Sequence, residues 1–190
     1  MSIIIEDGKG SGRSAGVDIH NHLQTAAVTR TEMSRASQED GEAFIFATGA
    51  FTAYTSAAGE GAVLYIKNTS TTRLLHIHSL RTCATQQAKW IMYKGTTGGD
   101  IVTTATAGTK ENINLTSSAT AEATVYRGAD NDTQTGGTFL SQWINNAGHS
   151  LEEYQGAVIL GQSDTLCLTV AVTTNGDVCA RFLGYFEDKE

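Results

Sequence analysis

Two pairs of histidines in the sequence have a spacing that could bind a metal ion. His20 and His22 flank one asparagine in GVDIHNHL, and His76 and His78 flank one isoleucine in RLLHIHSL. In an extended segment, residues two apart point to the same side, so each pair could offer two imidazoles to one ion. A zinc site needs three or four protein ligands, so a pair alone is incomplete.

The first pair has no third ligand at a recognisable spacing. As letters, His20, Asn21 and His22 spell the name of the H-N-H nucleases. Those enzymes take the three residues from separate parts of a ββα metal unit, and not from consecutive positions. We therefore expect neither a metal site nor nuclease activity at this segment.

The second pair has the spacing of two strand histidines in cupin metal sites, where a glutamate follows a few residues later and a distant histidine completes the set. After His78 the chain continues as SLRTCATQQ, which has no glutamate, and His149 is expected in a loop. A cupin-like metalloenzyme is therefore the weaker alternative. Histidines packed at a subunit interface fit the pattern equally well, and we expect no metal and no cofactor.

The faces of this segment follow from strand alternation. If residues 73–82 form a strand, His76 and His78 share one face with Leu74 and Leu80. Leu75 and Ile77 then occupy the other face.

The cysteines do not suggest a metal site or a disulfide framework. The chain has three cysteines, Cys83, Cys167 and Cys179, and no two of them have C-x-x-C spacing. An odd number cannot all be paired within one chain. Cys167 and Cys179 lie in expected strands and are predicted to be buried thiols. A bridge between these two would require an oxidising compartment.

Other catalytic signatures are missing from the sequence. The glycine-bearing turns GTTGGD and QTGGT do not lead into Gly-Lys-Ser/Thr, and no G-x-S-x-G elbow occurs. The acidic pairs Glu152–Glu153 and Glu187–Asp188 fall in turn-like or terminal positions and are expected on the surface. The sequence therefore predicts a protein that is not an enzyme.

Composition narrows the class of protein further. The chain has 190 residues, 40% of them hydrophobic, and a formal net charge of −7. A nucleic-acid binder needs a basic face, so this acidic balance argues against such a partner. No stretch reaches the 18 apolar residues of a membrane span, and the start of the chain has no basic segment of a signal peptide. We expect a protein made in the cytoplasm, with no membrane partner.

The elements that must position these residues are strands. Residues 1–42 are rich in glycine, serine and polar residues, and are predicted to form an extended N-terminal arm. Residues 43–190 are predicted to form one antiparallel jelly-roll-like β-sandwich, an all-β fold. Besides the last two strands, the expected strands are EAFIFATG, GAVLYIKN, RLLHIHSLRT, AKWIMYKG, DIVTTATAG, AEATVYRG, GTFLSQWI and QGAVILG. The segment NNAGHSLEEYQG could hold at most one helical turn.

The last two strands carry the strongest pattern. In DTLCLTVAVTTNGD the large aliphatic residues at 166, 168, 170 and 172 alternate with smaller ones, which places them on one face. In VCARFLGYF, the residues Val178, Ala180, Phe182 and Phe186 fall on one side. Asn175-Gly176 between the two segments predicts a hairpin turn, because both residues tolerate positive φ.

Three segments resemble β-sandwich structural proteins of tailed-phage virions: SAGVDIHNHLQTAAVT, GAVLYIKNTSTTRLLHIHSL and ATAEATVYRGADNDTQTGGTFL. In that family a G-V-D-x-x-x-x-L-x-x-x-A-V arm precedes a strand of A-V-L-Y-I-K-N type. A later A-x-x-x-x-Y-x-G segment leads to a T-G-G-like turn. The resemblance covers most of the chain, rests on structural turns and strands, and carries over no catalytic residue.

The resemblance implies a homotrimeric capsid decoration (cement) protein on the virion surface, with the major capsid protein as partner. The alternative is a carbohydrate- or receptor-binding protein of a head fibre or tail. The arm is then expected to be mobile in isolation and ordered on the particle. Its expected capsid-binding residues are Val17, Asp18, His20, His22, Leu23, Val28 and Arg30.

Overall fold

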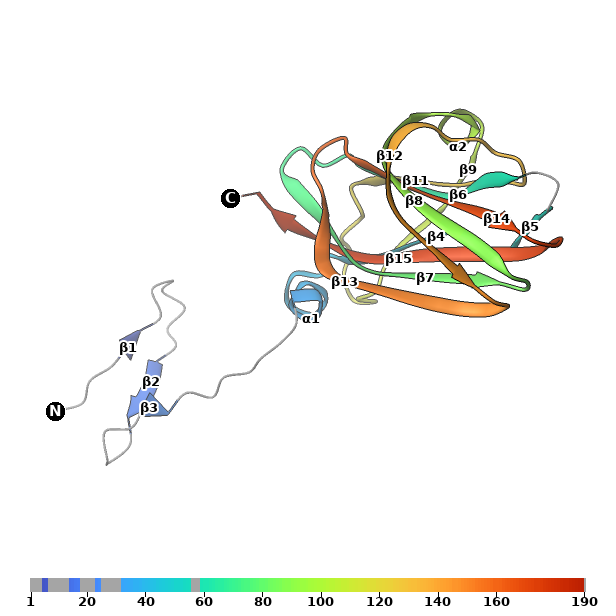
Figure 1. Cartoon of the computed structure of the whole chain (residues 1–190). Coiled ribbons are helices and arrows are strands. Elements are labelled where there is room, and N and C mark those ends of the chain that lie inside the picture. Colours follow the sequence, from blue (N-terminus) through green and yellow to red (C-terminus); the bar gives the residue numbers. More distant parts are fainter. Residues whose placement is uncertain (1–4, 7–13, 18–22, 25–31, 56–58, 190) are drawn as a thin grey trace. The chain divides into compact units, whose positions relative to one another are not determined.

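The computed structural model describes residues 5–6, 14–17, 23–24, 32–55 and 59–189 (Figure 1). The chain divides into two compact units, residues 1–31 and residues 32–190.

The first unit contains three short antiparallel strands in the order β1-β2-β3: β1 (Ile5–Glu6), β2 (Ser14–Val17) and β3 (Leu23–Gln24). Val17 of β2 is the register partner of Leu23 of β3. Two of the residues predicted to bind the capsid are thus neighbours in this small sheet.

The second unit is an antiparallel β-sandwich, which confirms the predicted fold class (Figure 1). Sheet I has the order β10-β4-β15-β7-β13, with β5 also paired to β15. Its strands are β4 (Ala43–Ala47), β5 (Thr52–Tyr54), β7 (Arg73–Ala84), β10 (Thr109–Asn112), β13 (Gly148–Leu160) and β15 (Gly176–Asp188).

Sheet II has the order β12-β8-β14-β6-β11-β9. Its strands are β6 (Glu60–Asn68), β8 (Ala88–Gly98), β9 (Thr106–Ala107), β11 (Ala123–Arg127), β12 (Thr135–Asn145) and β14 (Thr165–Val172).

The core lies between the two sheets and confirms the predicted faces of the last two strands. Sheet II contributes Leu64, Trp90 and the aliphatic residues 166, 168, 170 and 172 of β14. Sheet I contributes Phe44, Leu80 and the predicted residues 178, 180, 182 and 186 of β15. Large apolar side chains on alternating positions of both sheets therefore form one continuous core.

The predicted Asn175-Gly176 hairpin is wrong. β14 lies between β8 and β6 in sheet II, whereas β15 lies between β4 and β7 in sheet I. Both edges of each strand are therefore occupied by other strands, and residues 173–175 connect the two layers. Neither Asn175 nor Gly176 has the positive φ that a type I′ turn requires.

Two other strand predictions are also corrected. Asp100–Thr103, expected to start a strand, forms the one-turn helix α2. The carboxylate of Asp100 accepts hydrogen bonds from the backbone N–H and the hydroxyl of Thr133, which fixes this turn against the loop before β12. Conversely, β13 begins at Gly148, so it includes most of the segment in which at most one helical turn was expected.

A β-bulge in β7 changes the predicted faces of the histidine segment. The β7–β15 register shifts between Leu183 and Gly184, so that Ser79 and Ile77 have partners and His78 between them has none. Leu75, Ile77 and Leu80 consequently all face the core, and the prediction that Leu80 shares a face with the histidines is wrong.

The sandwich unit begins before residue 43, the predicted start of the β-sandwich domain. Helix α1 (Glu32–Arg35) continues as the π-helix η1 (Ala36–Asp40), which ends at Gly41 with φ 66°. Met33 and Ala36 are buried against Ala43 and Tyr185. Residues 32–42 thus pack on sheet I and belong to the compact unit.

We therefore expect a chain that begins at Glu32 to fold with the stability of the complete sandwich. A chain that begins at Ser37 should lose about 3 kcal/mol of unfolding free energy, because it lacks Met33 and Ala36 and leaves Tyr185 uncovered. Urea unfolding, followed by the fluorescence of buried Trp90, measures the unfolding free energy of the two truncated chains. Equal midpoints for the two truncated chains would contradict the assignment of residues 32–36 to the core.

Candidate interaction surface

The two sides of the sandwich end in very different strands. On one side, the edge strands β10 and β9 have four and two residues, and β10 carries Lys110 and Glu111. On the other, β12 and β13 have 11 and 13 residues and terminate the two sheets. Short, charged edges resist pairing with another chain, whereas long edges invite it. We call the exposed surface of β12 and β13 the β12–β13 edge.

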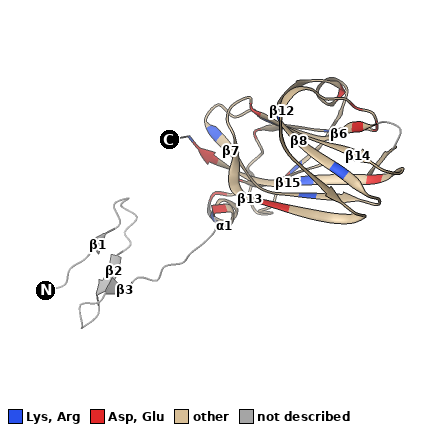
Figure 2. Cartoon of the chain, viewed as in Figure 1, with Lys and Arg blue, Asp and Glu red and all other residues tan. Residues whose placement is uncertain are grey.

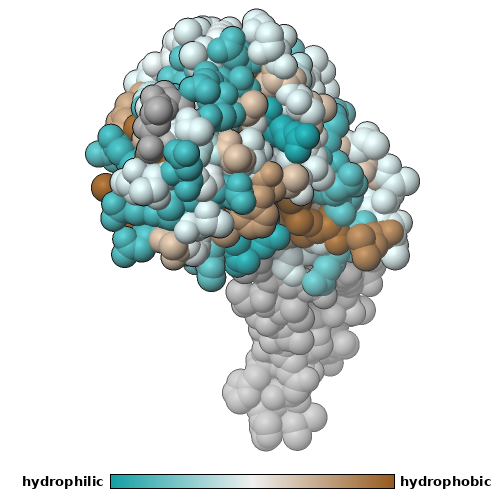
Figure 3. Space-filling view, turned by 90° about the vertical axis from the view of Figure 1, so that its right-hand side faces the viewer, coloured by the Kyte–Doolittle hydropathy of each residue, from teal (hydrophilic) through white to brown (hydrophobic). Residues whose placement is uncertain are grey.

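The β12–β13 edge exposes large apolar side chains. Ile144 is 67% exposed and Phe139 is 53% exposed, although both belong to a strand that pairs with β8. The other exposed apolar residues of this edge are Leu140, Leu151 and Ile159. At the end of the sandwich shown in Figure 3, apolar side chains gather in a band low on the surface, whereas polar side chains cover most of its upper part. Phe139 and Ile144 face outward on sheet II, and Leu151 and Ile159 face outward on sheet I. Exposed aliphatic and aromatic residues along two edge strands mark a candidate contact surface.

Charge is almost absent from this surface. No residue of β12 is charged, whereas Figure 2 shows charged residues on strands such as β8 and β15. β13 contributes Glu152 and Glu153. The chain also has no proline that could block an edge strand. An uncharged edge lets two molecules of net charge −7 approach with little local repulsion.

The edge is held in place by one hydrogen bond between the two sheets and by others within each sheet. Trp143 of β12 donates its indole N–H to the hydroxyl of Ser150 in β13 at 3.2 Å. Ser150 in turn shares a hydrogen bond of 2.6 Å with Thr82 of β7. Trp90 of β8 donates to the side-chain oxygen of Asn145 at 2.7 Å. The surface is therefore fixed before any partner binds.

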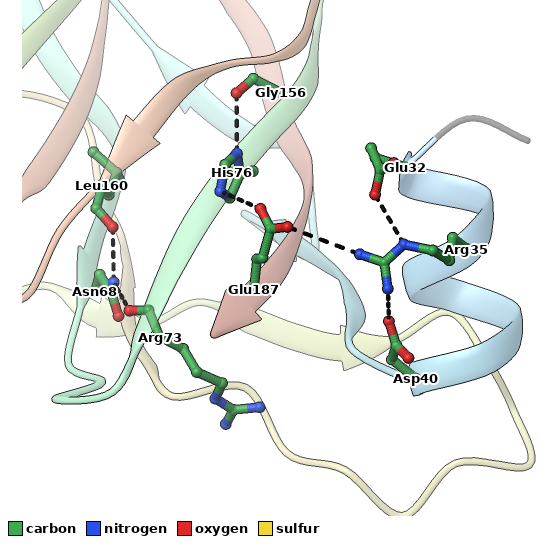
Figure 4. A network of polar contacts seen from close by, with 9 residues as sticks. All are labelled: Glu32, Arg35, Asp40, Asn68, Arg73, His76, Gly156, Leu160 and Glu187. Atoms are coloured by element: carbon green, nitrogen blue, oxygen red, sulfur yellow. Dashed lines mark hydrogen bonds and ion pairs between the residues drawn. The ribbon is translucent and has the colours of Figure 1, made fainter. Parts of the chain in front are cut away.

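A polar network on sheet I fixes the beginning of the sandwich unit (Figure 4). His76 Nδ1 lies 3.2 Å from the carbonyl of Gly156, and Nε2 lies 3.1 Å from a carboxylate oxygen of Glu187. The carbonyl of Gly156 and the carboxylate of Glu187 are both acceptors, so the tautomer of His76 decides which ring nitrogen donates. The imidazole also stacks on Tyr185, with 4.9 Å between the ring centroids.

Arg35 connects this network to the helical segment. Its guanidinium donates to Glu32 at 2.9 Å and to Asp40 at 2.6 Å, and lies 3.9 Å from Glu187. The hydrogen bond to Glu32 and the nearby carboxylates raise the pKa of Arg35 further above its ordinary value, and burial opposes them only partly. These contacts fix residues 32–40 on the outer face of sheet I.

Asn68 is the buried polar connection between the sheets. Its amide donates to the carbonyls of Leu160 at 2.8 Å and of Arg73 at 3.0 Å, and its oxygen accepts from the backbone N–H of Ser70 at 2.9 Å. The end of β6, the following turn and the end of β13 are thus held by one side chain (Figure 4).

The histidine pairs do not converge on a common ligand site. His76 is engaged by Gly156 and Glu187, whereas His78 lines a separate hollow with Arg81, Leu151 and Arg181. Over the part of the chain that the structure describes, no group of three or more His, Cys, Asp or Glu residues could hold a metal ion. His20 and His22 lie outside the described residues.

The predicted arm site is described only in part. Val17 and Leu23 lie in the small sheet of the first unit, and Asp18, His20, His22, Val28 and Arg30 lie outside the described residues. None of the described helices is long and apolar enough to cross a membrane.

Sequence reasoning missed the β12–β13 edge. The signal available was the long uncharged run from Thr135 to Asn145, but a run of strand-forming residues does not say whether the strand lies at an edge.

No family model matches the chain, and neither the curated proteins nor the solved structures contain a match.

Replacing Asn68 with alanine should lower the free energy of unfolding by about 3 kcal/mol, because buried carbonyls lose their donor. Chemical denaturation measures the loss. Asn146→Ala is the matched control, since Asn146 accepts one exposed hydrogen bond from Gln87, and its stability should stay within about 0.5 kcal/mol of the parent. If both variants unfold alike, Asn68 does not have the role assigned to it.

Proposed function

We propose that this protein is a non-enzymatic structural protein of a tailed-phage virion, a decoration protein that binds and stabilises the capsid surface. The observation that carries the proposal is the asymmetry of the sandwich edges. One side is closed by short or charged strands, and the other presents two long strands with exposed apolar residues. This arrangement suits a protein whose role is assembly.

The partner proposed for the β12–β13 edge is a second copy of the chain, within a homotrimer. The absence of charge on β12 supports self-association, because like charges placed opposite one another across an interface between copies would repel. Rotational symmetry allows three copies to cover all of their long edges in one closed assembly. The trimeric state itself comes from the resemblance to virion proteins.

The proposed capsid contact is the first unit. Residues 1–31 form a separate compact unit, and the sequence that resembles the virion arm lies within it. Arg35, Glu187 and His76 fix the first residues of the sandwich, so a force on the arm would be transmitted to sheet I. The capsid-binding residues proposed from the sequence stay a prediction.

Charged substitutions on the edge test self-association. Ile144→Glu and Phe139→Glu should each convert the trimer into a monomer, because a carboxylate would be buried without a partner in the interface. Light scattering after size-exclusion chromatography measures the mass. Glu111→Lys on the opposite edge is the control and should remain trimeric. A monomeric parent protein at high concentration would remove this part of the proposal.

Removal of the first unit tests capsid binding. A chain that begins at Glu32 should still form trimers and should no longer sediment with capsids of the phage that encodes this protein. The full chain is the control. Undiminished sedimentation of the truncated trimer would show that the sandwich, and not residues 1–31, makes the contact.

A second candidate function, glycan binding, is favoured by a row of aromatic residues on the outer face of sheet II. Register partners place Phe139, Tyr93, Cys167, Tyr65 and Tyr126 side by side on five strands. Ile101 of helix α2 covers the Tyr65 end, whereas Phe139 stays exposed. Exposed aromatic rings can stack on sugars.

A glycan array with the full chain separates the two functions. Binding to a defined glycan that is lost in Phe139→Ala and kept in Leu115→Ala, where an exposed residue lies elsewhere, would favour a receptor-binding role. The decoration proposal expects no glycan to be bound.

A further inference from the structure

Two cysteines from distant parts of the sequence lie side by side on sheet I. Cys83 of β7 and Cys179 of β15 are register partners in an antiparallel strand pair. Directly opposed residues in such a pair have Cα atoms about 4.5 or 5.5 Å apart, depending on the hydrogen-bonding position. Disulfides span Cα separations of about 4.4 to 6.8 Å, so both cases permit a bond.

Both thiols can be reached from solvent. Cys83 and Cys179 are partly exposed, and they line one hollow together with Phe51, Arg81 and Arg181. The prediction that Cys179 is a buried thiol is therefore wrong. A small disulfide reagent can approach this position.

The environment of Cys179 keeps this cysteine in the thiol form at neutral pH. Burial, and then the neighbouring Cys83 with which it shares a hydrogen bond, raise the pKa of Cys179 to about 11, although the Arg181 guanidinium acts in the opposite direction. The thiolate is the reactive form, so oxidation is slow at neutral pH and becomes faster as the pH rises.

Cys167 is a natural control. It lies in β14 of sheet II, fully buried beside Tyr65 and Ile101, and burial raises its pKa to about 12. The bridge between Cys167 and Cys179 considered from the sequence would have to join strands of different sheets.

We propose that Cys83 and Cys179 form an intramolecular disulfide by exchange with a low-molecular-weight disulfide. The thiolate of one cysteine attacks the reagent, forms a mixed disulfide and releases one reagent thiol. The thiolate of the other cysteine then attacks the protein sulfur of the mixed disulfide and releases the second reagent thiol. The two cysteine thiols lose their protons and are oxidised, and one reagent disulfide is reduced to two thiols.

The bond joins the two adjacent strands β7 and β15 of sheet I and closes the long loop of chain between them. A crosslink that closes a long loop lowers the conformational entropy of the unfolded chain, so the oxidised protein should be the more stable form. The inference does not depend on the proposed virion role.

The test uses the full chain treated with oxidised glutathione at pH 8.5, followed by intact mass and non-reducing peptide mapping. The expected result is loss of the mass of two hydrogen atoms and a crosslinked peptide pair containing Cys83 and Cys179. The melting temperature should rise by several degrees and return to its original value after reduction with dithiothreitol. Cys167→Ser should behave like the parent.

Cys83→Ser and Cys179→Ser should both abolish the intramolecular crosslink. Titration of the unaltered protein with phenylarsine oxide, which binds paired thiols, provides a test that needs no variant. One equivalent should remove two thiols from reaction with Ellman's reagent. A stable glutathione adduct without ring closure, a crosslink to Cys167, or no protection by the arsenical would each overturn the proposal.

Discussion

The placement of the consecutive strands β14 and β15 in two different sheets that share one core is the constraint on which the other features of the sandwich depend. β14 lies inside sheet II and β15 inside sheet I, so each strand pairs on both sides and presents an apolar face to the other layer. Leu166, Leu168 and Val170 therefore meet the layer that holds Phe182. Because these two strands are consecutive in the chain, residues 173–175 must cross between the layers. The other strands of each sheet lie on both sides of these two central strands.

The same arrangement explains where the surface is open. The edge strand of sheet I is β13 and that of sheet II is β12. Because a short connection joins β12 to β13, these two edge strands lie on the same side of the sandwich. Trp143 and Ser150 join the two layers there. The hydrogen bond holds the layers together but leaves the outer edge of each strand, and residues such as Ile144, exposed. The contact surface is thus a consequence of how the sandwich ends.

The outer face of sheet I combines several polar features along the paired strands β7 and β15. Tyr185 stacks on His76, and Glu187 reaches both His76 and Arg35. Farther along the same two strands, Cys83 lies opposite Cys179. One strand pair therefore holds the start of the sandwich at one end and the paired thiols at the other.

The sequence by itself determined the all-β class, the apolar faces of β14 and β15, and the absence of recognised catalytic motifs. Alternation of large and small residues reveals the strands and their apolar faces, because side chains of a strand have a period of two wherever the strand lies. Only the tertiary structure decided which strands pair. It separated the two strands that flank Asn175-Gly176, gave β7 its bulge at His78, placed Cys83 opposite Cys179, and left β12 and β13 at the edges. Strand order depends on contacts between residues far apart in the chain, and local sequence carries no direct record of them.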